Sequence, residues 1–181
     1  MTAGKTAAAA ALGLWLLALA GCGFFGGSPG ASSSGKEAQK EQITVTVYRP
    51  GQTGDLLYPE KYTMNKEPGV SPAAAAIGAL LREKPQEESH VNIFPPGIRL
   101  VSLKVKGGLA EADFSKEMLK IGIGGSLYEM LLVSSIVNTL TEFPEITSVQ
   151  LLVEGKKIDT IGGHMDIIDP LKRNASLIGK P

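Results

Sequence analysis

Three residues of this 181-residue chain are the first candidates for chemistry: its one cysteine, Cys22, and its two histidines, His90 and His164. A lone thiol can be a nucleophile, half of an intermolecular disulfide, a small core residue or an attachment point. A nucleophilic cysteine needs a nearby base and an orienting group, which lower its pKa. Because the neighbours of Cys22 are glycine, alanine and phenylalanine, catalysis is the weaker interpretation. A disulfide within the chain is excluded because there is no second cysteine.

A metal site built from the two histidines would also need carboxylates at compatible geometry. The nearest candidates are Asp166 and Asp169, close to His164 in the sequence. Neither histidine belongs to an HExxH motif or to a cluster with the spacing of metal ligands. We therefore expect histidines on the surface or packed against the tail, and we expect no metal and no other cofactor.

The remaining polar motifs point to structure more than to catalysis. The "GIGGS" stretch at 122–126 precedes a predicted helix, but it lacks the lysine of a phosphate-binding loop. Glu142 and Glu145 flank a proline at a helix end, where a solvated turn is the simpler interpretation. Ser134 and Ser135 fall inside a predicted helix, without the G-x-S-x-G motif of a serine hydrolase. No set of residues in the sequence indicates an enzyme.

The residues before Cys22 have the order of a secretory signal. Lys5 carries the only early charge, and residues 7–20 form an apolar run that is short for a membrane span but suits a signal-peptide core. The tetrapeptide "LAGC" at 19–22 resembles the lipobox of bacterial lipoproteins, in which the cysteine thiol receives a diacylglycerol and the chain is cut just before it. We therefore interpret residues 1–21 as a lipoprotein signal peptide and Cys22 as the lipid attachment site. The alternative is an uncleaved signal anchor.

The composition changes after this segment. Residues 22–42 are a glycine- and serine-rich tract followed by the polar stretch "KEAQKEQ", both without periodicity, which predicts a flexible spacer. Residues 43–174 are long enough for one domain with its own core, and residues 175–181 are expected to form a disordered end. No second apolar run of spanning length follows. We therefore expect the domain on the extracytoplasmic side of the cell membrane.

The charge pattern bears on the class of partner. The chain has 18 lysines and arginines, 18 aspartates and glutamates, and a formal net charge of zero. These charges are scattered singly, without a basic stripe or interleaved aromatic residues. This pattern argues against nucleic acid as a partner.

The first half of the domain predicts two extended segments and a helix. Ile43, Val45 and Val47 alternate with polar or amphipathic side chains, which indicates a half-buried strand. Residues 56–65 predict a second extended segment, which Pro59 places at a sheet edge or in a loop. A helix then opens at "SP" (71–72), with a serine cap and a proline in the first turn, and it is stopped by a proline at 85.

The second half predicts a hairpin, a long helix and a final strand. Alternating runs at 101–106 and 109–114 flank a Gly-Gly pair, which indicates a β-hairpin whose outer face pairs lysines with acids. A long helix begins at Ser126, with Glu129 three positions on as a capping-box partner. Residues 149–153 alternate again and predict the last strand.

This order of elements predicts an α+β fold with two helices packed on one face of a small mixed β-sheet. The long helix between the hairpin and the last strand is a crossover, which favours a parallel neighbour for that strand. The tail at 161–174 has no clear period, and we expect it to wrap back over the domain.

Three segments carry a resemblance to a known family. They are "PPGIRLVSLKVKGGLAEADFSKEM" (95–118), "SSIVNTLTEFPEITSVQLLVEGKKI" (134–158) and "GGHMDIIDPLKRN" (162–174). Together they resemble the GerMN domain of sporulation and spore germination proteins and of many bacterial lipoproteins, here in a single copy. The resemblance implies a non-catalytic module, with a fold similar to ring-building domains and without an active site to carry over.

Two functions from different classes follow. The first is a membrane-tethered, non-catalytic lipoprotein that acts in sporulation or germination through protein–protein assembly. Its partners would be envelope or sporulation-complex proteins, and self-association stays open. The alternative is an envelope lipoprotein that binds a wall fragment or small ligand, with His164, Asp166 and Arg173 as candidate contacts. An exported hydrolase is the least supported interpretation.

Overall fold

The computed structural model describes residues 41–120 and 124–180. Cys22, the expected signal peptide and nearly all of the expected spacer therefore lie outside the described residues. The elements in chain order are β1 (Gln42–Pro50), β2 (Leu57–Asn65), α1 (Pro72–Arg82), β3 (Leu100–Lys106), β4 (Leu109–Phe114), the 3₁₀ helix η1 (Lys116–Leu119), α2 (Gly125–Leu140), β5 (Ser148–Val153), β6 (Lys156–Lys157) and the 3₁₀ helix η2 (Ala175–Leu177). None of the helices in this part of the chain has the length and apolar character that a membrane crossing requires.

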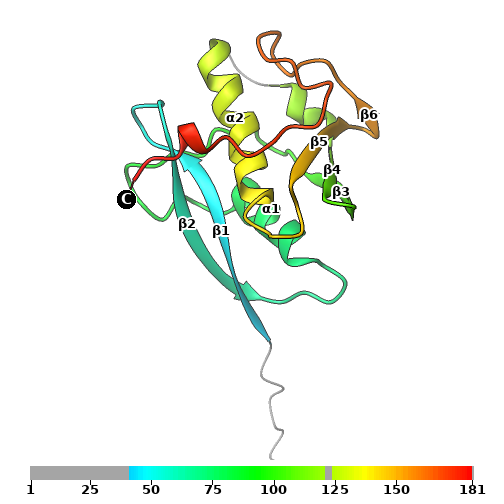
Figure 1. The fold of residues 1–181 in the computed structure, drawn as a ribbon. Helices are drawn as coiled ribbons and strands as arrows, with labels where there is room; N and C mark the ends of the chain where they lie inside the picture. Colours follow the sequence, from blue (N-terminus) through cyan, green and yellow to red (C-terminus); the bar gives the residue numbers. More distant parts are fainter. Residues whose placement is uncertain (1–40, 121–123, 181) are drawn as a thin grey trace, which may run out of the picture. The chain divides into compact units, whose positions relative to one another are not determined.

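The strands form two sheets, and the predicted α+β class is confirmed (Figure 1). β1 and β2 make an antiparallel pair, and the other sheet has the order β3-β4-β5-β6. The predicted hairpin is present as antiparallel β3 and β4, with Lys104 opposite Glu111. The predicted parallel neighbour is also present, because β5 runs parallel to β4. The sequence predicted one sheet, but β1 and β2 form a separate sheet because α1 packs between β1 and β3.

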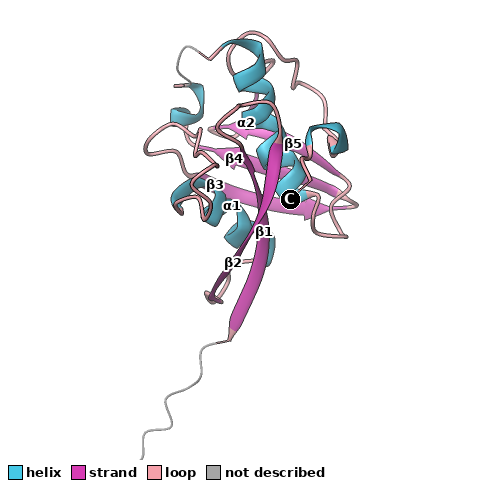
Figure 2. Ribbon diagram, turned by 90° about the vertical axis from the view of Figure 1, so that its left-hand side faces the viewer, coloured by secondary structure: helices cyan, strands magenta, loops and turns pink. Residues whose placement is uncertain are grey.

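Both helices contact β1, and they also contact the four-stranded sheet, α1 at β3 and α2 at β5. Figure 2 shows the β1–β2 pair running crosswise to β3, β4 and β5. One apolar core fills the space around the helices. Its fully buried members include Val47 of β1, Ile77 and Leu80 of α1, Ala110, Ala112 and Phe114 of β4, Leu132, Ile136 and Leu140 of α2, and Val149 and Leu151 of β5.

The register of β4 and β5 explains the inward face of the mixed sheet. Ala110 lies beside Val149, and Ala112 lies beside Leu151, so each small side chain on β4 is next to a larger one on β5. All four are essentially inaccessible to solvent. The small alanines leave room for the side chains of the helices, as close packing of a core requires.

The start and end of α1 follow the local signals in the sequence. The hydroxyl oxygen of Ser71 accepts a hydrogen bond from the amide of Ala74 at 3.2 Å, and Pro72 occupies the first turn. The helix ends at Arg82, and Glu83 is already extended. The helix thus stops ahead of Pro85, as predicted.

The start of α2 differs from the prediction. Gly124 is the residue at the N-cap, and no side chain caps the helix there. The capping-box role expected for Glu129 is therefore wrong. Its side chain is completely buried and binds the segment 160–164 instead. The expectation failed because several donors from this distant segment surround the carboxylate.

The C-terminal tail wraps over the domain as expected, but its end is not the disordered segment that the sequence predicted. Leu171 pairs with Val149 through two backbone hydrogen bonds of 2.7 and 2.8 Å, on the side of β5 that faces away from β4 and that also carries β6. Further on, Ile178 forms a parallel bridge with Leu57, and the amide of Gly179 donates to the Leu57 carbonyl at 2.8 Å. Figure 1 shows this segment, coloured orange to red, crossing α2.

A buried ion pair ties the β1–β2 pair to the end of α1. Arg49 is inaccessible to solvent, and its Nε donates to Oε2 of Glu60 at 3.0 Å. The two terminal nitrogens of Arg49 donate to the carbonyls of Ala79, Leu80 and Glu83, at 3.1, 3.0 and 2.8 Å. Carbonyls in the last turn of a helix lack intrahelical partners and carry partial negative charge. The guanidinium group therefore caps α1 from inside the core.

Glu60 in turn collects donors from the segment that follows α1. It accepts a hydrogen bond from the Tyr62 hydroxyl at 2.7 Å and from the Gln86 amide at 3.0 Å, and its Oε1 lies 2.7 Å from Nδ1 of His90. Burial by itself raises the pKa of Glu60. The hydrogen bonds from Tyr62, His90 and the backbone outweigh burial and hold this pKa below its ordinary value.

Replacing Arg49 tests this arrangement. We expect Arg49→Met to lower the free energy of unfolding by about 3–5 kcal/mol, because it leaves the buried Glu60 carboxylate without its countercharge. Combining Arg49→Met with Glu60→Gln should recover part of the loss. The measurement is urea unfolding of both variants beside Arg99→Met, which alters an exposed arginine. Equal stability of Arg49→Met and Arg99→Met would contradict the role given to the pair.

Candidate functional site

The structure does not bring the two histidines together. Nδ1 of His90 lies beside Glu60, whereas Nδ1 of His164 lies 3.2 Å from Oε2 of Glu129. Among residues 41–120 and 124–180, no group of three or more histidine, cysteine, aspartate and glutamate side chains is placed to hold a metal ion. Asp166 instead accepts a hydrogen bond from the amide of Ile168, two residues on.

The most strongly perturbed carboxylate is Glu129 on α2. Its Oε1 accepts hydrogen bonds from the Thr160 hydroxyl and the amides of Ile161 and Gly162, at 2.7, 2.9 and 2.8 Å. Its Oε2 accepts from the amide of His164 at 2.9 Å. Burial raises the pKa of Glu129. The donors, with the Gly162 amide and the Thr160 hydroxyl foremost, outweigh burial and lower this pKa to about 2.

The hydrogen bonds of Glu129 fix the loop 160–164 and leave the carboxylate unable to act on a substrate. A general acid or base must hold or release a proton near the working pH and reach a substrate. The Glu129 carboxylate is ionised, inaccessible and fully engaged by its own chain. Its role is to bind the segment 160–164 to α2.

The other candidate residues are separated or engaged in packing. Arg173 forms a 2.8 Å ion pair with Glu142 and lies over the ring of Tyr48, 4.9 Å from its centroid. It therefore does not join His164 and Asp166, which line a separate hollow of about 430 Å³. The expected solvated turn is present at Glu145, which is exposed.

The two adjacent serines in the second half of α2 face the interior. Ser134 and Ser135 are both buried, as expected for residues that allow close packing of the helix. The "GIGGS" stretch falls partly outside the described residues, and its last three residues form the cap and first turn of α2.

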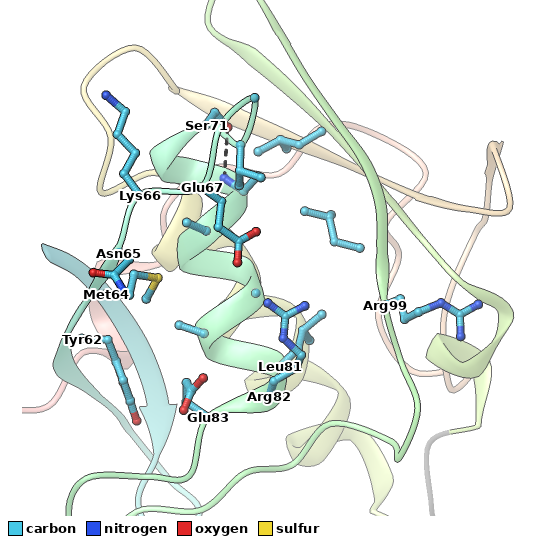
Figure 3. A pocket seen from close by; sticks show the side chains of 18 of the residues that line it. Tyr62, Met64, Asn65, Lys66, Glu67, Ser71, Leu81, Arg82, Glu83 and Arg99 are labelled. Carbon is cyan, nitrogen blue, oxygen red and sulfur yellow. Dashed lines mark hydrogen bonds between the residues drawn. The ribbon is translucent and has the colours of Figure 1, made fainter. Parts of the chain in front are cut away.

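A groove of about 1040 Å³ lies along α1 (Figure 3). One wall is the end of β2, from Tyr62 to Asn65, and the other is formed by residues 98–103 at the start of β3. The loop 66–71 closes one end. The floor is α1, where Ala74 and Gly78 leave the helix backbone close to the surface.

Charged side chains of both signs border the groove. Lys66, Arg82 and Arg99 contribute positive charge, and Glu67 and Glu83 contribute negative charge. Figure 3 shows Glu67 and Arg82 extending over α1. The Arg82 guanidinium lies directly against Gly78, where an added Cβ would meet its nitrogen at 2.8 Å. The groove therefore offers an elongated, polar-rimmed surface, which suits an extended segment or a carboxylated ligand.

Comparison with known proteins identifies the family. The sequence matches the family described as "Germane: Sporulation and spore germination" over residues 46–159, which is most of the domain. The chain belongs to this family. The resemblance to GerMN domains found in the sequence is thereby confirmed, and the family links the chain to sporulation or germination. No curated protein sequence matches the chain.

Solved structures of GerMN domains share this fold. The tandem GerMN domains of the sporulation protein GerM from Bacillus subtilis superpose with a TM-score of 0.59 at 23% identity. That alignment covers 82% of this chain but only 51% of the tandem structure, about half its length. The first GerMN domain of the same protein gives a TM-score of 0.58 at 24% identity, covering 72% of this chain and 98% of the domain.

A third structure comes from a Clostridium perfringens protein described as a lipoprotein. It has a TM-score of 0.51 at 24% identity, and the alignment covers 72% of this chain and 87% of that protein. At these identities the three superpositions establish the fold. The family match in the sequence stops at residue 159, so the tail that binds Glu129 and β5 lies beyond it.

Lowering the pH tests the Glu129 site. Because the pKa of Glu129 is depressed from 4.5 to about 2 in the folded protein, its stabilisation is complete above pH 4.5 and is lost as the pH falls towards 2. At pH 7 we expect Glu129→Gln to cost on the order of 3 kcal/mol of unfolding free energy. This cost should shrink below pH 4.5.

The measurement is chemical unfolding at pH 7, 4 and 3, with Glu145→Gln as the matched control on an exposed carboxylate. The control should stay within about 0.5 kcal/mol of the unmodified protein at each pH. A Glu129→Gln cost that does not change with pH would rule out an ionised, hydrogen-bonded carboxylate as its source.

Proposed function

We propose that this protein is a lipoprotein, tethered to the extracytoplasmic side of the cell membrane through Cys22, that acts in sporulation or germination by non-catalytic assembly with other proteins. The observation that carries the proposal is the combination of a lipobox-like "LAGC" (19–22) with a domain of the sporulation and spore germination family. Residues 22–42, between the signal peptide and the domain, would be the spacer that holds the domain off the bilayer.

Several observations support the tether. An apolar run precedes Cys22, and glycine, serine and proline follow it, so the thiol stands at the junction of a signal and a spacer. One of the proteins with this fold, from Clostridium perfringens, is described as a lipoprotein. Two or more acyl chains on one cysteine would hold a protein at a membrane far more firmly than a single chain.

A non-catalytic role is supported by what the reactive side chains do in the structure. Glu60, Glu129 and Arg49, which lie in polar clusters, are buried and bound to the backbone of their own chain. These clusters fix elements of the fold. The groove along α1 and the neighbouring strand β3 are exposed and are available for contact with another molecule.

The volume of the groove favours one second candidate, an envelope lipoprotein that binds a wall fragment. About 1040 Å³ is in the range of small-ligand sites, and Arg82 and Arg99 at its border suit a carboxylate. A rise in the unfolding temperature with muropeptides, lost in Arg82→Ala, would favour this function over assembly.

The first experiment is to follow the tagged protein through a sporulation time course, beside a Cys22→Ala variant. We expect the unmodified protein in the membrane fraction and concentrated at the septum or engulfing membrane. We expect Cys22→Ala to leave the lipidated pool, because the acyl chains cannot be attached. An even membrane distribution, or no synthesis during sporulation, would contradict the assembly role. Unchanged lipidation of Cys22→Ala would contradict the tether.

A further inference from the structure

β3 is the terminal strand of the four-stranded sheet. One of its edges pairs with β4, from Leu100 opposite Phe114 to Lys106 opposite Leu109. In the described ranges 41–120 and 124–180, no other backbone or side-chain group forms a hydrogen bond with the main chain of residues 100–106. The outer edge is therefore a row of open N–H and C=O groups, which can template another strand.

Apolar side chains are exposed along this strand. Val101 is 56% exposed and Val105 is 43% exposed. They are two of the four large apolar side chains that are exposed in the described part of the chain, the others being Leu119 and Leu127. Two such residues on one seven-residue strand give an added strand apolar surface to cover.

The charge on this edge has one sign. Arg99, Lys104 and Lys106 are exposed, and the sequence 98–108 contains no aspartate or glutamate. In the neighbouring groove, Arg82 adds positive charge, and Glu67 and Glu83 add negative charge. The acids opposite the strand on β4 are Glu111, which faces Lys104, and Asp113, which faces Ser102 and is buried. An approaching strand therefore meets an excess of positive charge.

This charge selects between two kinds of occupant. A second copy pairing β3 with β3 would place lysines and arginines against their own kind, and like charges across a strand pair are destabilising. The register shift between Leu100 and Ser102 is a β-bulge, which leaves residues 102–106 as the regular part of the edge. An acidic strand meets no such repulsion, and residues 102–106 keep a regular register for it.

We propose that β3 binds an acidic, extended segment of a partner protein by strand addition. The added strand hydrogen-bonds to residues 102–106, its carboxylates face Lys104 and Lys106, and its apolar side chains cover Val105. Beyond the bulge, the segment continues into the groove along α1, where residues 98–103 form the shared wall. This inference deepens the proposed function and rests on its assembly part.

The test uses the full-length protein in nanodiscs of neutral phosphatidylcholine. The probe is a short fluorescent peptide in which glutamate alternates with valine and threonine, and its counterpart carries lysine in place of glutamate. We expect the acidic peptide alone to bind, more weakly at high salt because the charges are exposed. Equal binding of the lysine peptide would overturn the proposal.

Matched variants locate the binding site. We expect Lys104→Glu with Lys106→Glu to weaken binding of the acidic peptide by roughly tenfold or more. Lys156→Glu with Lys157→Glu, the same change on the exposed strand β6, should leave it unchanged. A glutamate at position 104 would lie opposite Glu111 and would disturb the strand pair by repulsion. The neutral variant Lys104→Gln with Lys106→Gln avoids this repulsion, and we expect it to weaken peptide binding by a smaller factor. Unaltered binding in both β3 variants would overturn the proposal.

Hydrogen exchange distinguishes the acidic strand from other occupants of the same edge. The acidic peptide should slow exchange of the amides in residues 102–106. Slowed exchange without peptide in discs containing phosphatidylglycerol would assign the edge to the membrane surface. Slowed exchange that grows with protein concentration would assign it to a second copy. Either result overturns the inference. If the protein concentrates at the septum but does not bind the acidic peptide, the proposed function stands and only this inference is contradicted.

Discussion

The buried pair of Arg49 and Glu60 fixes the position of α1, and much of the structure depends on that position. A guanidinium group removed from water must have its donors satisfied, because an unpaired buried charge costs several kcal/mol. Here the donors are satisfied by Glu60 of β2 and by carbonyls at the end of α1. These hydrogen bonds therefore hold the end of α1 at a fixed distance from β1 and β2. Since α1 is the floor of the groove and β2 is one of its walls, the same pair fixes that wall relative to the floor.

The elements that could be predicted from the sequence are those with local signals. Ser71 and Pro72 begin α1, a Gly-Gly pair turns the hairpin, and alternation marks β5. The sites could not be predicted because their partners are distant. Glu129 meets donors 31 to 35 positions away, and Arg49 meets helix carbonyls 30 to 34 positions away. Ser126 and Glu129 have the spacing of a capping box, so the sequence predicted a local role for Glu129. Its actual partners in segment 160–164 leave no such local signal.

The tail shows the same limit in another form. Its order comes from single contacts with different elements, which leave no periodicity in the sequence. Asn174 exchanges two hydrogen bonds with the side chain of Asn138 on α2, at 2.8 and 3.0 Å, and Ile178 pairs with the start of β2. The end at 175–181 shows no pattern of an element in the sequence and was expected to be disordered, although the amide of Gly179 donates to the Leu57 carbonyl.

The features that stabilise the domain and the surface proposed for binding lie on different elements. The tail and the Glu129 site cover α2 and the side of β5 that faces away from β4, whereas the groove and the open strand edge belong to α1 and β3. Lys104 and Lys106 are exposed, so their side chains can change at little cost to the core. Under the proposed strand addition, a change in the charge of β3 would alter the preferred partner, while the buried pair still holds α1 against β1 and β2. Partner choice in this domain would then be a matter of surface charge on a fixed strand.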